Sequence, residues 1–362
     1  MTPARADSDE ILLERRRALG VVTLNRPQAL NTLSLAMYRA ADPQLAAWDR
    51  DPSIRAILVQ ANGGKAFCAG GDVRAIYEAR GQAAGVGDYK ADFFREEYRL
   101  IERLHRSPKP HVALVDGIAM GGGMGISVNG SHRVASERTL MAMPEVQIGL
   151  FPDVGATRFL NRCPGKIGLY LALTGKRIKA ADALYCGFVT HHVPHERHSA
   201  VAAVLTEVAW RAGEEHAQVD EVLRGFHRDP GPAPLAALQP AIDRCFSAPD
   251  VEAILRALAK EDTEWAESAI AAIERASPIS VKITFRQLEI GMAGLDIRAA
   301  LALEYRMTQH VMAAHDFYEG IRAVLVDKDQ KPRWQHRSLA EVTDAEVARY
   351  FESLGERELT FP

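Results

Sequence analysis

Two stretches of this sequence share one order: an apolar strand, a glycine-rich turn and the start of a helix. In the first, the strand Ile54–Gln60 is followed by Lys65–Asp72 and by a helix from Val73. In the second, the strand His111–Asp116 is followed by Gly117–Gly125 and by a helix that continues to about residue 129. Such alternation of strands and helices predicts a layered α/β fold. The glycines let a ligand approach the main chain closely, and each helix start offers unpaired N–H groups.

The remaining pattern predicts three segments. Short strands are expected within residues 11–25, 133–136, 140–143 and 189–193, and an amphipathic helix with Ser34 as its N-cap over 34–49. After Asp153 the sequence becomes mostly helical, with a Pro- and Gly-rich break at 228–236. We therefore expect an α/β core over 11–195, a helical C-terminal region over 196–340 and a tail over 341–362.

Composition excludes several classes of protein. The 362 residues carry a formal net charge of −3, which argues against nucleic acid or an anionic membrane as the partner. No run approaches eighteen apolar residues, so no transmembrane helix is expected. Four widely spaced cysteines form no CxxC pair, and the first ten residues show no targeting pattern. These features favour a cytoplasmic protein with reduced thiols.

The segment Met143–Gly155 places two carboxylates, Glu145 and Asp153, in largely apolar surroundings. A carboxylate that loses solvation has a raised pKa and can move protons near neutral pH or act as a nucleophile. The alternative is structural: Glu145 follows Pro144 in a first helical turn, and Asp153 is an N-cap after Pro152.

Common catalytic and nucleotide-binding motifs are absent from the sequence, including GxGxxG after a strand, GxxxxGK[ST], HExxH and GxSxG. The histidines at 191, 192, 195 and 198 lack the further ligands of a metal set, so a polar surface loop is the preferred interpretation. What remains is two groups of main-chain donors and two carboxylates. Donors aimed at a carbonyl oxygen suit a developing oxyanion, so the pattern indicates an acyl or enolate site without a metal.

Three stretches resemble the crotonase (enoyl-CoA hydratase/isomerase) superfamily: KAFCAGGD at 65–72, DGIAMGGG at 116–123 and PE…GLFP at 144–152. The resemblance extends from about residue 11 onward. It implies a crotonase-like (ββα)n spiral core that holds the thioester carbonyl of an acyl-CoA with two main-chain amides. By position, these are the amides of Gly71 and Gly122.

Within the superfamily the sequence is most similar to the 3-hydroxyisobutyryl-CoA hydrolases. The supporting stretches are FFREEY at 93–98, MPE…LFPDVG at 143–155, DFYEGIRA at 316–323 and DKD…PRW at 327–334. That resemblance implies substrate or catalytic roles for Glu97, Gly122, Glu145 and Asp153. It also implies an acyl-CoA substrate and no separate cofactor. Many superfamily members form homo-oligomers through their C-terminal helices, but the longer helical half of this sequence leaves its assembly open.

One departure separates the sequence from the hydratases, which use two glutamates. The first of these falls on Gly125, whereas Asp153 replaces a residue that is usually glycine in hydratases. We therefore expect thioester hydrolysis, with Glu145 as base or nucleophile and with Asp153 and Glu97 at the substrate hydroxyl. Enoyl-CoA hydration and a non-catalytic acyl-CoA-binding protein remain the alternatives.

Each of these residues also has a structural interpretation. Glu97 is then a helix-surface acid beside Glu96, and Gly71 and Gly122 are glycines that tight turns require. CoA phosphates and adenine need basic and apolar contacts, but the sequence does not identify them.

Overall fold

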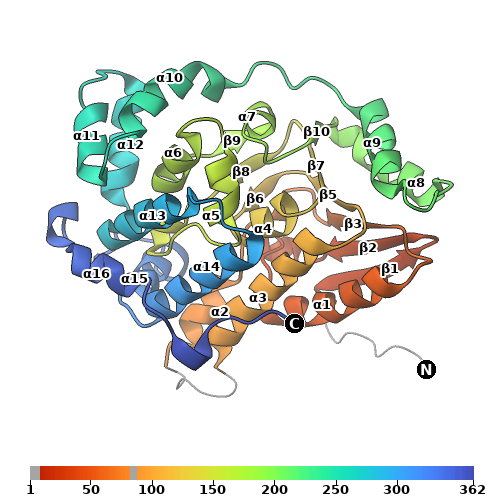
Figure 1. Cartoon of the computed structure of the whole chain (residues 1–362), viewed down its shortest axis with the longest axis horizontal. Coiled ribbons are helices and arrows are strands. Elements are labelled where there is room, and N and C mark those ends of the chain that lie inside the picture. Colours follow the sequence, from red (N-terminus) through yellow and green to blue (C-terminus); the bar gives the residue numbers. More distant parts are fainter. Residues whose placement is uncertain (1–8, 82–87) are drawn as a thin grey trace. The chain divides into compact units, whose positions relative to one another are not determined.

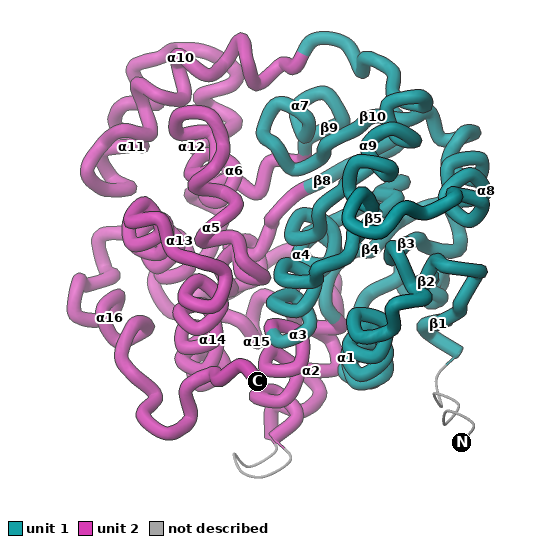
Figure 2. The backbone as a smooth tube through the Cα atoms, turned by 45° about the vertical axis from the view of Figure 1, so that its right-hand side comes forward, with its two compact units in different colours: residues 1–71, 99–141, 178–232 teal, residues 72–98, 142–177, 233–362 magenta. Residues whose placement is uncertain are grey.

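The computed structural model describes residues 9–81 and 88–362, which form two compact units (Figure 2). Unit 1 contains the described residues of Met1–Gly71, Arg99–Met141 and Ile178–Pro232. Unit 2 contains those of Asp72–Tyr98, Ala142–Arg177 and Ala233–Pro362. The boundaries expected at residues 195 and 340 concern contiguous segments of sequence and stay a prediction.

A six-stranded sheet with the order β1-β2-β3-β5-β7-β10 forms the centre of unit 1 (Figure 1). Its strands are β1 (Ile11–Arg16), β2 (Leu19–Leu24), β3 (Ala56–Ala61), β5 (His111–Val115), β7 (His132–Ala135) and β10 (His191–His192). β1 and β2 pair antiparallel, with Ile11 opposite Leu24, and the other neighbours pair parallel.

Burial along the strands explains this order. All five residues of β5 are buried, as expected for a parallel strand covered on both faces. β1 lies at the edge of the sheet and exposes Glu14, Arg15 and Arg16. Charged side chains on an edge strand oppose pairing with another chain.

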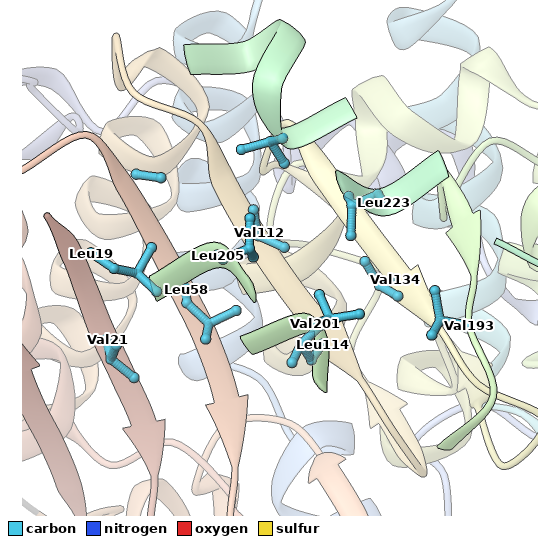
Figure 3. Packing of buried hydrophobic residues seen from close by; sticks show 12 residues of the cluster. Leu19, Val21, Leu58, Val112, Leu114, Val134, Val193, Val201, Leu205 and Leu223 are labelled. Atoms are coloured by element: carbon cyan, nitrogen blue, oxygen red, sulfur yellow. The ribbon is translucent and has the colours of Figure 1, made fainter. Parts of the chain in front are cut away.

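The core of unit 1 forms where two helices cover one face of this sheet (Figure 3). The helices are α8 (His198–Glu207) and α9 (Glu215–Phe226), which contribute Val201, Leu205 and Leu223 to it. From the strands, the core includes Leu19, Val21, Ala56, Leu58, Val112, Leu114 and Val134. Truncating one fully buried leucine to alanine in such a core typically costs about 2–5 kcal/mol.

The other helices of unit 1 include the one predicted after Ser34. Helix α1 (Leu35–Arg50) begins there, and the Ser34 hydroxyl accepts a 3.3 Å hydrogen bond from the amide of Met37, so the predicted N-cap is confirmed. The remaining helices are η1 (Pro27–Ala29), α4 (Gly122–Val128), α7 (Ala180–Tyr185), η4 (His195–Arg197) and the second part of α3 (Tyr89–Arg106).

A second, four-stranded sheet has the order β4-β6-β8-β9. It contains β4 (Ala66–Cys68), β6 (Ile118–Met120), β8 (Leu140–Ala142) and β9 (Ile178–Lys179). The sequence predicts only glycine-rich turns where the structure has β4 and β6. β6 begins where it does because Gly117, with a φ of +84°, turns the chain after β5. A Cβ at this position would lie 2.5 Å from the carbonyl oxygen of Lys65.

Unit 2 is mainly helical, as predicted for the C-terminal half. It contains the first part of α3 together with α2 (Val73–Glu78), η2 (Glu145–Ile148), α5 (Ala156–Phe159), η3 (Leu160–Arg162), α6 (Ile167–Thr174), α10 (Pro234–Phe246), α11 (Val251–Leu258), α12 (Glu264–Arg275), α13 (Pro278–Gly291), α14 (Ile297–Met312), α15 (Asp316–Ile321), the π-helical η5 (Arg322–Val326), η6 (Leu339–Glu341), α16 (Asp344–Arg349) and η7 (Gly355–Arg357). Side-chain caps begin several of these helices, among them Asp250, Thr263, Ser277, Asp296 and Thr343.

Among the described residues, no helix is both long enough and apolar enough to span a bilayer.

Candidate active site

Glu145 opens the short 3₁₀ helix η2, directly after Pro144. The structural interpretation is therefore right about the helical turn, but it does not explain the burial of the side chain. Glu145 is 6% exposed, and its Oε2 has no hydrogen-bond partner among the described residues. Burial, followed by the charges of Asp153 and Glu97, raises the pKa of Glu145 well above its usual value. A buried carboxyl with an unbonded oxygen is available for chemistry.

The turn that bears Glu145 is held by close main-chain packing. Gly149 ends η2 in the left-handed conformation (φ +74°), and a Cβ there would lie 2.3 Å from the carbonyl oxygen of Asp316. In the same way, a Cβ on Gly320 would lie 2.4 Å from the carbonyl of Ile148. Helix α15, part of the DFYEGIRA stretch, therefore packs directly behind Glu145.

Asp153 lies on the loop that follows, and it is 4% exposed. The Tyr98 hydroxyl donates a 2.7 Å hydrogen bond to its Oδ2. Burial raises the pKa of Asp153 to about 7, although the hydrogen bond from Tyr98 acts in the opposite direction. The N-cap interpretation is wrong, because α5 begins at Ala156 with Gly155 as its N-cap and no side-chain cap.

Glu97 lies in α3 and is 2% exposed, so it is not a helix-surface acid. Its charge contributes to the raised pKa of Glu145. Unit 2 thus contains Glu97, Glu145 and Asp153, the three acids that the sequence singled out, all of them buried.

Sequence analysis missed two further members of this cluster, Tyr98 and Glu304. Tyr98 is fully buried, and burial together with the charge of Asp153 raises the pKa of its hydroxyl. Glu304 lies in α14 and accepts hydrogen bonds from the amides of Gly155 and Thr157 and from the Thr157 hydroxyl. A detectable signal existed, because Glu304 is the one acid in the otherwise apolar run LALEY.

The two proposed amide donors, Gly71 and Gly122, lie in unit 1 at the ends of adjacent strands. β4 pairs parallel with β6, and each strand leads into a glycine turn. Gly122 is the first residue of α4, so its amide has no acceptor within the helix. At Gly71 the chain bridges to Leu33, through a 2.9 Å bond from the Leu33 amide to the carbonyl of Gly70.

Neighbouring glycines have clear steric roles. Gly121 has a φ of +47°, and a Cβ on Gly123 would lie 2.2 Å from the carbonyl oxygen of Cys68. Gly125 is buried within α4 and, as expected, provides no acid at the position of the first hydratase glutamate.

The structure shows no group of histidine, cysteine and acidic side chains suited to a metal within residues 9–81 and 88–362. The histidine-rich stretch is not simply a surface loop, as sequence analysis suggested. His192 and His198 are both 8% exposed, and their rings bond to the carbonyls of Arg228 and Val193.

Comparison with known proteins gives the family. Residues 19–351 match the enoyl-CoA hydratase/isomerase family model. The chain is 46% identical to mitochondrial 3-hydroxyisobutyryl-CoA hydrolase of Rattus norvegicus, over 98% of this chain and 92% of the relative. The corresponding human protein is 44% identical, over 98% and 91% of the two chains.

Two solved structures confirm the α/β, crotonase-like fold with its helical C-terminal region. A carnitinyl-CoA dehydratase from Mycobacterium thermoresistibile superposes with a TM-score of 0.90 and 38% identity, covering 98% of this chain and 99% of that one. An enoyl-CoA hydratase from Rhodobacter sphaeroides superposes with a TM-score of 0.88 and 38% identity, covering 98% of this chain and 100% of that one.

The expected cytoplasmic location is contradicted by the relatives, which are designated mitochondrial. That expectation rested on the first ten residues and on dispersed cysteines. All four cysteines are free and buried in the structure, and buried structural thiols do not distinguish one reducing compartment from another. The match to the family model and the near full-length relatives agree with the site motifs, and the chain belongs to the enoyl-CoA hydratase/isomerase (crotonase) family.

Proposed function

We propose that this protein is an acyl-CoA thioester hydrolase that converts 3-hydroxyisobutyryl-CoA and water to 3-hydroxyisobutyrate and CoA, a reaction of valine catabolism. The observation that carries the proposal is the buried pair Glu145 and Asp153, both with raised pKa values. The names of the near full-length relatives support the same substrate.

In the proposed mechanism, the amides of Gly71 and Gly122 donate to the thioester oxygen and form an oxyanion hole. Removing one such donor from an enzyme typically costs about 3 kcal/mol of barrier, which shows the size of this contribution. CoA itself is part of the substrate, and the reaction as written needs no further cofactor.

Glu145 acts next, in one of two ways. As a base, it takes a proton from water while the water oxygen attacks the carbonyl carbon. As a nucleophile, it attacks the carbon directly, and the resulting anhydride is then opened by water. In both routes the C–S bond breaks and the CoA thiolate takes up a proton. Asp153 positions the water or the substrate 3-hydroxyl, and Glu97 binds that hydroxyl.

Enoyl-CoA hydration is the second candidate, because the two solved structures cited above carry dehydratase and hydratase names. Hydration in this family uses a second glutamate, and this chain has Gly125 at that position. Hydrolysis is therefore the function that the residues favour. Assembly into a homo-oligomer stays a prediction.

The direct test measures thiol release from 3-hydroxyisobutyryl-CoA beside loss of the conjugated thioester absorbance of crotonyl-CoA. We expect rapid thiol release from the first substrate and no change in the second. Loss of crotonyl absorbance without thiol release would establish hydration and refute our use of Gly125. Inactivity toward both would contradict the proposed substrate.

We expect Tyr98→Phe to shift the pH dependence of hydrolysis. Activity that needs the Asp153 carboxylate is lost as pH falls through about 7, the pKa of that group. The Tyr98 hydroxyl stabilises the charged form, so its removal raises the pKa, and the acid limb of kcat/KM moves to higher pH by about one unit. The matched control is Tyr77→Phe in α2, which should leave the limb in place. If the acid limb of kcat/KM in Tyr98→Phe lies at the same pH as in wild type, or at a lower pH, the hydroxyl does not have this role.

A further inference from the structure

Glu304 is a buried acid on helix α14, remote in sequence from the other carboxyls. Its exposure is 0%, and no lysine, arginine or histidine is paired with it among the described residues. Burying a carboxyl without a cation is costly unless hydrogen bonds compensate. Three donors provide that compensation, and all three come from Gly155 and Thr157 at the start of α5, just after Asp153.

The hydrogen bonds divide between the two oxygens of Glu304. Oε2 accepts from the Gly155 amide at 2.7 Å. Oε1 accepts from the Thr157 amide at 2.9 Å and from the Thr157 hydroxyl at 2.7 Å. Two amides two residues apart therefore point at one carboxylate, an arrangement in which main-chain N–H groups bind an anion.

The loop needs such support because its backbone is unusual. Val154 has a φ of +57° and Gly155 a φ of +89°, so two consecutive residues are left-handed. A β-branched residue in this region is strained and persists only where its surroundings hold it. Val154 directly follows Asp153, so the strained residue and the acid share one turn.

Other contacts hold the same turn. The amide of Ala156 donates to the carbonyl of Asp153 at 2.9 Å. The Gln287 side chain donates to the carbonyl of Pro152 at 2.7 Å and to the Thr157 hydroxyl at 2.8 Å. Glu304 and Gln287 thus meet at Thr157, and Glu304 is the acidic member of the pair.

We propose that Glu304 is a positioning residue for the reaction: by binding the amides of Gly155 and Thr157 it fixes the turn that presents Asp153. This inference rests on the function proposed above for Asp153. Glu304 itself does not touch the substrate in this proposal. It acts through the main chain and through its electrostatic interaction with Asp153.

The electrostatic part agrees with the geometry. Burial and the charge of Asp153 raise the pKa of Glu304 to about 8, against the effect of the three donors. Asp153, with a pKa of about 7, therefore ionises before Glu304 as pH rises, and its charge opposes ionisation of Glu304. Replacing Asp153 by asparagine removes that charge and should lower the pH at which Glu304 ionises.

The test is Glu304→Gln measured alone and together with Asp153→Asn. A glutamine keeps the shape of the side chain but turns an N–H₂ group toward one of the donors. We expect kcat to fall by about 10²-fold in the wild-type background, since misplacement by about 1 Å has effects of that size. In the Asp153→Asn background the same change should cost less than about 3-fold, because residues that act as a unit are not additive.

Three measurements distinguish this role from general damage. KM should change little, and the change in the pH profile near 8, where Glu304 ionises beside the Asp153 carboxylate, should disappear, which a purely structural loss would not cause. The control Glu267→Gln, on an exposed position of α12, should leave kcat unchanged. Equal losses in the two backgrounds, or an unaltered kcat in Glu304→Gln, would overturn the proposal.

A milder variant tests the same role if Glu304→Gln does not fold. Thr157→Val keeps the side-chain shape and removes the hydroxyl, which donates to Glu304 and accepts from Gln287. It should lower kcat by about 3- to 10-fold, the effect of one or two hydrogen bonds, and this loss should again vanish beside Asp153→Asn. A Thr157→Val protein with full activity would refute the role of Glu304.

Failure of the proposed function gives a different result. If wild-type protein releases no thiol, the hydrolase proposal falls, but ionisation of Glu304 can still be followed by difference infrared spectroscopy of its carboxyl band. A shift of this ionisation to lower pH in Asp153→Asn supports the coupling of the two groups, and an unmoved band overturns it.

Discussion

Glu145→Gln is expected to reduce kcat for thioester hydrolysis by about 10²- to 10⁴-fold, the range typical for loss of a catalytic base. Glutamine has nearly the same volume and fits the buried turn of η2, but it can neither accept the proton of a water molecule nor form an anhydride. KM should change little, because the substrate contacts proposed for the main-chain amides remain. The measurement is steady-state thiol release from 3-hydroxyisobutyryl-CoA.

The control for this variant is Glu274→Gln on an exposed position of α12, which should retain full activity. Thermal unfolding of both variants should be cooperative. Glu145→Gln should unfold at no lower temperature than wild type, because an uncharged side chain avoids the desolvation cost that raises the pKa of Glu145. Turnover within a factor of two of wild type in a folded Glu145→Gln protein would remove Glu145 from the chemistry.

A second measurement separates the two proposed roles of Glu145. If Glu145 is the nucleophile, hydroxylamine added during turnover should trap the anhydride and leave a hydroxamate on this residue, which increases the mass of the peptide. If Glu145 is a base, no covalent change appears on the peptide although hydrolysis proceeds. The Asp153→Asn variant is a suitable background, because slower use of water would allow an anhydride to accumulate.

Much of the fold could be predicted from local pattern. Ser34 was correctly identified as a helix cap, since a polar side chain before an amphipathic run has few other local uses. β5 was evident because a continuous apolar run suits a strand covered on both faces. The strands β4 and β6 were missed, because three-residue strands between glycines depend on pairing with distant segments rather than on their own pattern.

The candidate site was predictable only in part. Glu145 and Asp153 were identified from their apolar segment and Glu97 through family resemblance, and all three acids are buried in unit 2. Tyr98 and Glu304 were missed because their importance lies in the partners they meet, 55 and 149 residues away from them in sequence respectively. No local pattern carries such long-range pairings.

The motifs that first suggested a hydrolase also have a physical meaning in unit 2. The FFREEY stretch supplies Glu97 and Tyr98 from one helix, and DFYEGIRA packs α15 behind the turn of Glu145. Helix α14 supplies the acid that binds the loop of Asp153. The helical C-terminal region therefore packs against the segments that carry both proposed catalytic carboxyls, which gives a reason for its length.

Asp153→Asn is expected to lower activity by about 10²-fold and, at the same time, to stabilise the fold at alkaline pH. Burial raises the pKa of Asp153 from 3.8 to about 7. The folded chain therefore binds this proton more tightly than the unfolded chain. The stabilisation that results is fully present below pH 4 and is lost as pH rises through about 7.

Asparagine carries no charge, so the variant should avoid this loss. Its oxygen can still accept the hydrogen bond from Tyr98. At pH 8 we expect a gain of about 2–4 kcal/mol over wild type, because each unit of pKa shift corresponds to about 1.4 kcal/mol. The gain should disappear near pH 4, where Asp153 is protonated in both states.

Thermal unfolding between pH 4 and pH 8 provides the measurement. The difference in Tm between Asp153→Asn and wild type should increase with pH, by roughly 2–4 °C for each kcal/mol in a protein of moderate size. The control is Asp344→Asn, at an exposed position of α16. Its Tm should differ little from that of wild type, and this difference should not increase with pH. A Tm difference that is constant with pH would mean that Asp153 ionises with an ordinary pKa. Asp153 would then be an ordinary solvated carboxylate, and its burial beside Tyr98 could not be the source of its reactivity.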